Sequence, residues 1–317
     1  MRKMLRFFKK ALLDMIYRVN YKVVTRKPVG GLEDLTLEKF FRLHIPTYDG
    51  SGQGVHPSLL VQDGGSPRFV LSFTPYTDTD DRVENPSVVI SDDGIHFREE
   101  RPGINPLVPA PEKDHNDDPD LFCSNGKYCI LYLETMRPER QSLVLLESLD
   151  RIHWDMRVIH VENLAGSSGC FMLSPKYIEK DGLSWLFYVN RDAVGGYRIE
   201  YVTGKDLYSL DFAHRNAVTV SGFKALPWHL DIIQSEGKYM MLLTTASGPE
   251  KNARYTLCLA RSRNLTDWEL DSGFALPDCY RSSGFEKDGV LYLYVSKIFL
   301  PAWNRKRWNI LLYKIKK

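Results

Sequence analysis

The feature that most constrains this 317-residue sequence is a unit of three short, β-prone apolar segments that recurs five times. In the second unit these segments are 118–122, 127–134 and 142–148. The first two segments of a unit are mostly joined by a turn of a polar residue and glycine, a strong hairpin signal; these turns are Asn125-Gly126, Asp181-Gly182, Glu236-Gly237 and Asp288-Gly289. The units begin near Pro57, Pro119, Pro175, Asp231 and Ser283. Their spacing of about 50–60 residues is that of a propeller blade. The sequence therefore predicts an all-β fold, a five-bladed β-propeller with four-stranded antiparallel blades.

The fifth unit runs out of chain before it can form a fourth strand. Its third segment ends at Tyr313, four residues before Lys317. We expect a segment between Tyr21 and Pro46 to supply the missing strand, because this would close the ring and leave no open edge.

The first 27 residues form a second, different region. They hold nine lysines and arginines against one acidic residue, Asp14, a net charge of +8. Their apolar residues recur at helical spacing and predict a short basic amphipathic helix; they are Leu5, Phe8, Leu12, Met15, Ile16 and Val19. We therefore divide the chain into this helix, 1–27, and a propeller domain, 28–317. The helix either docks on the propeller or contacts an anionic membrane surface through residues 1–20.

Composition excludes several classes of protein. The whole chain carries +2, so residues 28–317 carry −6 and offer no basic face for nucleic acid. Lys9, Lys10 and Asp14 interrupt the only N-terminal apolar run, and no small-residue cleavage site follows, so we predict a cytoplasmic protein without an export signal. The five cysteines are widely spaced and match neither a zinc site nor a disulfide framework.

Polar residues gather where the units begin. In a propeller the inner strand of every blade starts at the same mouth of the central funnel, so these residues converge although they are far apart in sequence. Carboxylates, imidazoles, an arginine and aromatic walls around one funnel suit a polyhydroxylated ligand. The candidate substrate-binding residues are His56, His115, Asp117, Tyr76, Ser174, Asn190, Trp228 and Arg281. Among these, Trp228 is the candidate stacking surface.

The repeat, the Asp118-Pro119-Asp120 motif and the turn Ser91-Asp-Asp-Gly-Ile-His-Phe97 resemble the five-bladed glycoside hydrolase superfamily. Its members include family 43 arabinanases and xylosidases, the invertase-like fructosidases of family 32, the neoagarooligosaccharide hydrolases of family 117 and the mannoside phosphorylases of family 130. The resemblance covers about residues 50–317. It implies that Asp118 is the blade-two aspartate that sets pKa and orientation. Where that superfamily has an aspartate in blade one and a glutamate in blade three, this sequence has His56 and Ser174.

Loss of both carboxylates removes the ordinary pair of acid and base for glycoside hydrolysis, so other residues must replace them. Candidate catalytic residues are Asp118, Asp231, His229, Asp49, Glu84 and Glu134. The resemblance to the neoagarooligosaccharide hydrolases, which use a histidine as acid, favours His229 beside Asp231 in that role, with Asp49 or Glu84 as base. Because imidazole titrates near neutrality, His56 and His115 are further candidate acids. We predict no cofactor and no metal-ligand motif, although a funnel lined by acids could hold a cation such as calcium.

The leading functional prediction is a glycoside hydrolase, or a glycosyl-transferring enzyme, that acts on an oligo- or polysaccharide by general acid/base catalysis. The alternative is a non-catalytic carbohydrate-binding propeller or a scaffold in surface-glycan metabolism. The absent carboxylates of blades one and three favour the alternative. The many ionisable residues at the strand heads favour an enzyme.

Overall fold

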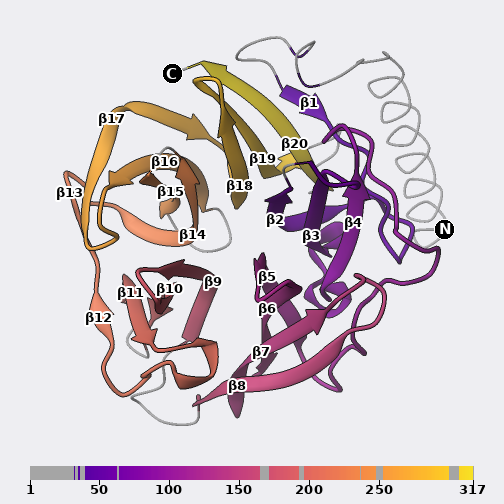
Figure 1. The fold of residues 1–317 in the computed structure, drawn as a ribbon, viewed down its shortest axis with the longest axis horizontal. Coiled ribbons are helices and arrows are strands. Elements are labelled where there is room, and N and C mark those ends of the chain that lie inside the picture. The colour runs from indigo at the N-terminus through magenta and orange to yellow at the C-terminus, as the bar shows by residue number, and fades with distance from the viewer. Residues whose placement is uncertain are drawn as a thin grey trace, which may run out of the picture.

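The computed structural model describes residues 32, 35, 40–62, 64–164, 171–192, 196–235, 237–247, 253–299 and 307–316. Five β-sheets surround a central axis (Figure 1). The inner strands are β2 (Gly54–Val61), β5 (His115–Ser124), β9 (Phe171–Lys180), β14 (Leu226–Ser235) and β18 (Ser282–Lys287). The predicted five-bladed β-propeller is therefore confirmed. The predicted helix within residues 1–27, with its membrane contact and its boundary to the propeller, lies outside the described residues. None of the helices in the described ranges is long and apolar enough to cross a membrane.

Blades two and three have the expected four strands. Blade two is β5 (His115–Ser124), β6 (Lys127–Met136), β7 (Arg140–Ser148) and β8 (Asp155–Asn163). Blade three is β9 (Phe171–Lys180), β10 (Leu183–Arg191), β11 (Tyr197–Gly204) and β12 (Asn216–Ala217).

Blades one and four depart slightly from the four-strand pattern. Blade one is β2 (Gly54–Val61), β3 (Phe69–Pro75) and β4 (Ser87–Ser91), and an isolated bridge between Ile90 and Arg98 extends it. Blade four is β14 (Leu226–Ser235), β15 (Lys238–Ser247), β16 (Arg254–Ser262) and β17 (Asp267–Pro277), to which β13 (Thr219–Ser221) adds a parallel edge. Within the described residues the blades thus hold three to five strands.

Blade five closes the ring as predicted. It consists of β18 (Ser282–Lys287), β19 (Val290–Phe299), β20 (Arg307–Lys316) and β1 (Phe40–Arg42). β1 comes from the N-terminal side of the chain and pairs antiparallel with β20, Phe41 opposite Leu312 (Figure 1). The first and last described parts of the chain therefore hold one another in a single sheet.

The hydrophobic core is divided among the five seams between blades, and the period of two along each strand explains the division. In β6, Leu131 and Leu133 pack toward blade three, whereas Ile130 and Tyr132 pack toward blade one. Both faces of the middle strands are consequently buried, which accounts for their continuous apolar runs.

The polar turns expected between first and second strands are also present. Asn125 and Gly126 have φ angles of 50° and 75°, and Asp181 and Gly182 have 53° and 73°. Two consecutive residues in the left-handed region are the geometry that a two-residue hairpin turn requires.

Candidate functional site

Five residues at the heads of the inner strands meet on the propeller axis. This upper layer, one residue from each blade, consists of His56, Asp118, Ser174, His229 and Arg281, and all five are buried. Asp118 is its centre. Its Oδ1 accepts a hydrogen bond from Arg281 Nη1, and its Oδ2 accepts one from the Ser174 backbone N–H at 2.7 Å. The prediction that Asp118 lies among converging strand heads is confirmed.

An unusual backbone conformation aims three of these side chains at the axis. His56, Asp118 and Ser174 have φ angles of 52°, 52° and 51°, and each precedes a proline. At each of them the pairing of the inner strand with its neighbour shifts register. Left-handed conformation is costly for residues other than glycine, and such strain concentrates at functional sites.

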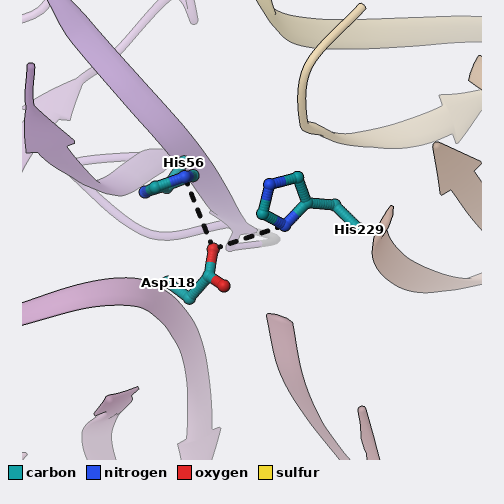
Figure 2. Close-up of side chains that lie close together, drawn as sticks. All are labelled: His56, Asp118 and His229. Atoms are coloured by element: carbon teal, nitrogen blue, oxygen red, sulfur yellow. Dashed lines mark ion pairs between the residues drawn. The ribbon is translucent and has the colours of Figure 1, made fainter. Parts of the chain in front are cut away.

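The two histidines flank Asp118 and point toward its carboxylate (Figure 2). His56 Nε2 and His229 Nδ1 each lie 3.6 Å from Asp118 Oδ1. The other nitrogen of His56, Nδ1, lies 3.1 Å from Glu84 Oε2, and His229 Nδ1 lies 2.6 Å from Ser174 Oγ. Glu84, a predicted base, is therefore placed behind His56 and orients its ring.

The surroundings drive the pKa values of the two histidines in opposite directions. Burial alone would lower the pKa of His56, but the carboxylates of Asp118 and Glu84 outweigh it and raise that pKa above its usual value. Burial lowers the pKa of His229 well below its usual value; the positive charges of His56 and Arg281 add to this, and Asp118 only partly opposes it. One imidazole is thus stabilised as the cation and its neighbour as the neutral base.

Several buried polar atoms around this layer make no hydrogen bond within the described part of the chain. They are His56 Nε2, His229 Nε2, Arg281 Nε, Thr244 Oγ1, Ser282 Oγ and Ser296 Oγ. Buried polar groups are normally satisfied, so a cluster of unsatisfied ones calls for a binding partner. They lie at or beside strand ends on one end of the propeller, where a ligand with many hydroxyl groups could satisfy them.

His56, Asp118 and His229 could together hold a metal ion. One ligand atom each from His56, Asp118 and His229 lies within 4.8 Å of the others. Coordination would require both imidazoles to be neutral, so His56 would have to give up its proton. Two imidazole nitrogens and one carboxylate suit zinc or another first-row divalent cation, whereas calcium prefers six to eight oxygen ligands. Arg281 already places one positive charge on Asp118 and would reduce the affinity for a dication.

Below the upper layer lies a second ring of residues, two positions further along each inner strand. This lower layer consists of Ser58, Asp120, Lys176, Asp231 and Ser283, all on the axis side of their strands. Lys176 Nζ lies 2.9 Å from Asp120 Oδ1 and 2.9 Å from Asp231 Oδ1. Asp231, predicted as a partner of His229, is thus engaged with a lysine one layer lower.

Two other predicted catalytic carboxylates lie away from the centre. Asp49 is exposed and accepts hydrogen bonds from Ser51 in its own turn and from Thr77. Glu134 is partly exposed at the end of β6 and pairs with Arg140 at 3.0 Å. The structure does not bring either carboxylate into the upper layer.

The predicted binding residues of blade two form a charged rim beside η3 (Asp81–Val83). His115 Nε2 lies 3.1 Å from Asp117 Oδ2, and its Nδ1 lies 2.6 Å from Asp114 Oδ1. Burial would lower the pKa of His115, but Asp117, Glu84 and Asp114 raise it to about 10.

The remaining predicted binding residues lie on other blades around the mouth. Tyr76 follows β3 and packs against the Trp308 ring, and Trp228 packs beside His229. Asn190, near the end of β10, donates to Glu200 Oε2 at 2.9 Å.

Sequence reasoning missed Tyr280 and Lys176. Tyr280 covers both histidines, with ring centroids 5.5 Å from His56 and 4.7 Å from His229. A signal existed for Lys176, because it lies two residues after Ser174 just as Asp120 follows Asp118. For Tyr280 no pattern in the sequence indicated a position over the axis.

No family model and no curated protein sequence matches this chain. Solved structures do. An N-acetylgalactosamine deacetylase from F. plautii, in complex with blood group B trisaccharide, superposes with a TM-score of 0.72 at 19% identity and covers 86% of this chain and 94% of its own. The chain shares the fold of that protein. A thermostable family-43 glycoside hydrolase superposes with a TM-score of 0.59 at 13% identity and covers 83% of this chain and 88% of its own. An exo-1,5-alpha-L-arabinanase from a bovine ruminal metagenomic library superposes with a TM-score of 0.57 at 14% identity. It covers 88% of this chain and 95% of its own.

Proposed function

We propose that this protein is a hydrolase that acts on an oligo- or polysaccharide, with the upper layer as its reaction centre. The observation that carries the proposal is the pair of buried histidines on either side of Asp118, one favoured as a cation and the other as a neutral base. Paired groups whose pKa values are driven apart are the signature of acid and base roles. The unsatisfied polar atoms beside them, and the carbohydrate-directed proteins that share the fold, support a sugar as the substrate.

For cleavage of a glycosidic bond, His56 is the general acid and His229 the base. Protonated His56 donates its Nε2 proton to the leaving oxygen, and His229 takes a proton from the attacking water. The Asp118 carboxylate lies between them and would stabilise positive charge at the anomeric carbon. This assignment keeps a histidine as acid but transfers the role from His229 to His56, because burial lowers the pKa of His229.

Removal of an acyl group from a sugar is the second candidate reaction. The observation that favours it is the charge of the centre, where Arg281 neutralises Asp118 and no second carboxylate of the described residues joins the upper layer. His229 would again activate water. The N–H groups of His56 Nε2 and Arg281 Nε would stabilise the oxyanion that forms on the acyl carbon.

A divalent cation bound by His56, Asp118 and His229 would supply Lewis-acid activation of water or a carbonyl in either reaction. In that state the roles that remain to the chain are those of Glu84, which holds the His56 ring, and of Ser174, which holds the His229 ring. We also retain the prediction of a cytoplasmic protein whose N-terminal helix either docks on the propeller or contacts a membrane through residues 1–20. Cell fractionation would distinguish the two.

The test is a screen of wild type and His229→Gln on a glycan panel, with reducing ends and released acetate measured in parallel. Wild type should release one of the two products, and His229→Gln should lose that release while still binding the glycan. His153→Gln is the matched control, because the imidazole of His153 is exposed in the turn between β7 and β8. Binding without release by wild type would leave the non-catalytic alternative. Metal analysis of the purified protein and dialysis against a chelator decide between the proton-only and metal-assisted forms.

A further inference from the structure

Six aromatic rings form a continuous arc around the mouth of the funnel. In spatial order this aromatic arc is Tyr76, Trp308, Tyr280, Tyr255, Trp228 and Tyr197. Successive ring centroids are 5.4, 4.8, 5.0, 5.8 and 5.6 Å apart. The arc starts in blade one, crosses blades five and four, and ends in blade three.

The arc passes directly over the reaction centre. Tyr280, near its middle, lies against both histidines, and Trp228 lies 5.8 Å from His229. Two arms therefore extend from Tyr280, one through Trp308 to Tyr76 and the other through Tyr255 and Trp228 to Tyr197. A molecule held along the arc would have its middle, and not its end, against the histidines.

The rings of the arc are not a sealed core. All except Trp308 keep part of their surface exposed. The indole N–H groups of Trp228 and Trp308 are buried and donate no hydrogen bond within the described part of the chain. A buried indole N–H normally finds an acceptor, so these two donors point to a ligand that offers oxygen atoms beside an apolar surface.

The opposite side of the mouth has a different character. The seam between blades one and two carries the carboxylates of Asp81, Asp114, Asp117 and Glu84, together with Arg137 and His115. A ligand that fits both sides has one flat apolar face and polar edges. Sugar rings have this property, since their C–H groups form a face and their hydroxyl groups lie around the edge.

We propose that the aromatic arc is a binding track for an oligosaccharide of at least three sugar units. The reacting unit packs against Tyr280, and its neighbours pack on the two arms. The inference rests on the proposed function in taking the ligand to be a carbohydrate, and it adds that the substrate is an extended chain read on both sides of the reacting unit.

The experiment measures binding as a function of glycan length. Arabino-, manno- and galacto-oligosaccharides of one to six units are printed on an array and probed with His229→Gln, so that no bond is cleaved. The same background then carries Tyr76→Ala or Tyr197→Ala, at the two ends of the arc. Tyr208→Ala is the matched control, because this tyrosine is 51% exposed and packs under Arg157, outside the arc. Thermal unfolding confirms that each variant is folded.

We expect affinity to rise from one unit to at least three in one of the series. Each arc variant should weaken binding of the longest glycan about tenfold, the effect of one lost aromatic contact, and leave the monosaccharide unchanged. The control should bind like its parent. Binding that is independent of length, arc variants that bind like the parent, or no glycan bound would overturn the inference. If wild type cleaves glycans but shows no length dependence, only this inference fails; if it binds long glycans without reaction, only the proposed function fails.

Discussion

The upper and lower layers of the funnel have nearly the same geometry and opposite chemistry. Both take one residue from each blade, and all of these residues are buried except Lys176, whose side chain is 13% exposed. In the lower layer Lys176 lies between Asp120 and Asp231, and two serines accept backbone N–H groups. In the upper layer a single carboxylate faces an arginine and two imidazoles, whose Nε2 atoms make no hydrogen bond among the described residues. Ion pairs between blades stabilise the lower layer, whereas the Nε2 atoms of the upper layer are available to a ligand.

The largest expected effect on stability is in the lower layer. Lys176→Met removes the cation that Asp120 and Asp231 share and leaves two buried carboxylates without a countercharge. The free energy of unfolding should fall by about 3–5 kcal/mol in urea denaturation. Lys180→Met, at a lysine paired with the largely exposed Asp181, should leave the free energy of unfolding nearly unchanged, because water screens an exposed ion pair. A Lys176→Met protein as stable as wild type would refute the structural role of the lower layer.

The corresponding change in the upper layer should act on turnover. His229→Gln removes the neutral imidazole that takes the proton, and turnover should fall about 10²- to 10⁴-fold. The free energy of unfolding should change less than in Lys176→Met, because His229 carries no compensating charge. Steady-state kinetics and urea denaturation are measured on the same samples. A His229→Gln protein that is less stable than Lys176→Met would contradict the prediction.

The charged rim of blade two should contribute to folding stability, as the lower layer does, because its charges are paired. The pKa of His115 is raised to about 10, above the unfolded value near 6.5, so protonated His115 stabilises the folded state. This stabilisation is complete below about pH 6.5 and is lost as the pH rises toward about 10. The free energy of unfolding of wild type should therefore fall over this pH range, whereas that of His115→Gln should not show this fall. Equal slopes of stability against pH between 6.5 and 10 would show that the rim is not a charge-paired group.

The smallest effect is expected from Ser174→Gly. Glycine relieves the strain of φ 51°, worth about 1–2 kcal/mol, but the change also removes the Oγ contact with His229, worth about 1 kcal/mol. The free energy of unfolding should therefore stay within about 1 kcal/mol of wild type while turnover falls. Unchanged turnover would mean that the serine does not position the imidazole.

Much of the fold could be predicted from residue patterns, because its causes are local. The hairpin turn at Asn125-Gly126 follows from residues that tolerate positive φ, and the alternation in β6 follows from the period of a strand. Strand closure by residues before Pro46 was predictable from the missing fourth strand of the fifth unit. The axis position of Asp118 followed from its place at the head of a unit.

The layer to which a residue belongs was not predictable in the same way. His229 and Asp231 do lie on one side of β14, as alternation requires. His229 nevertheless belongs to the upper layer and Asp231, two residues later, to the lower layer. The register shift after Pro227 and the lysine from blade three decide this, and neither is visible in the sequence around Asp231. Asp49 and Glu134 shared the residue type of a catalytic carboxylate but not the position.

By itself, then, the sequence determined five blades and the residues that head them, Asp118 among them, since these depend on turns, periodicity and strand order. Only the tertiary structure decided that His56 and His229 flank that carboxylate, that Glu84 orients one of them and that Tyr280 covers both. The physical reason is that charge, pKa and ring contacts depend on distances of a few ångströms between residues that are 28 or more positions apart. Those distances exist only once the ring has closed.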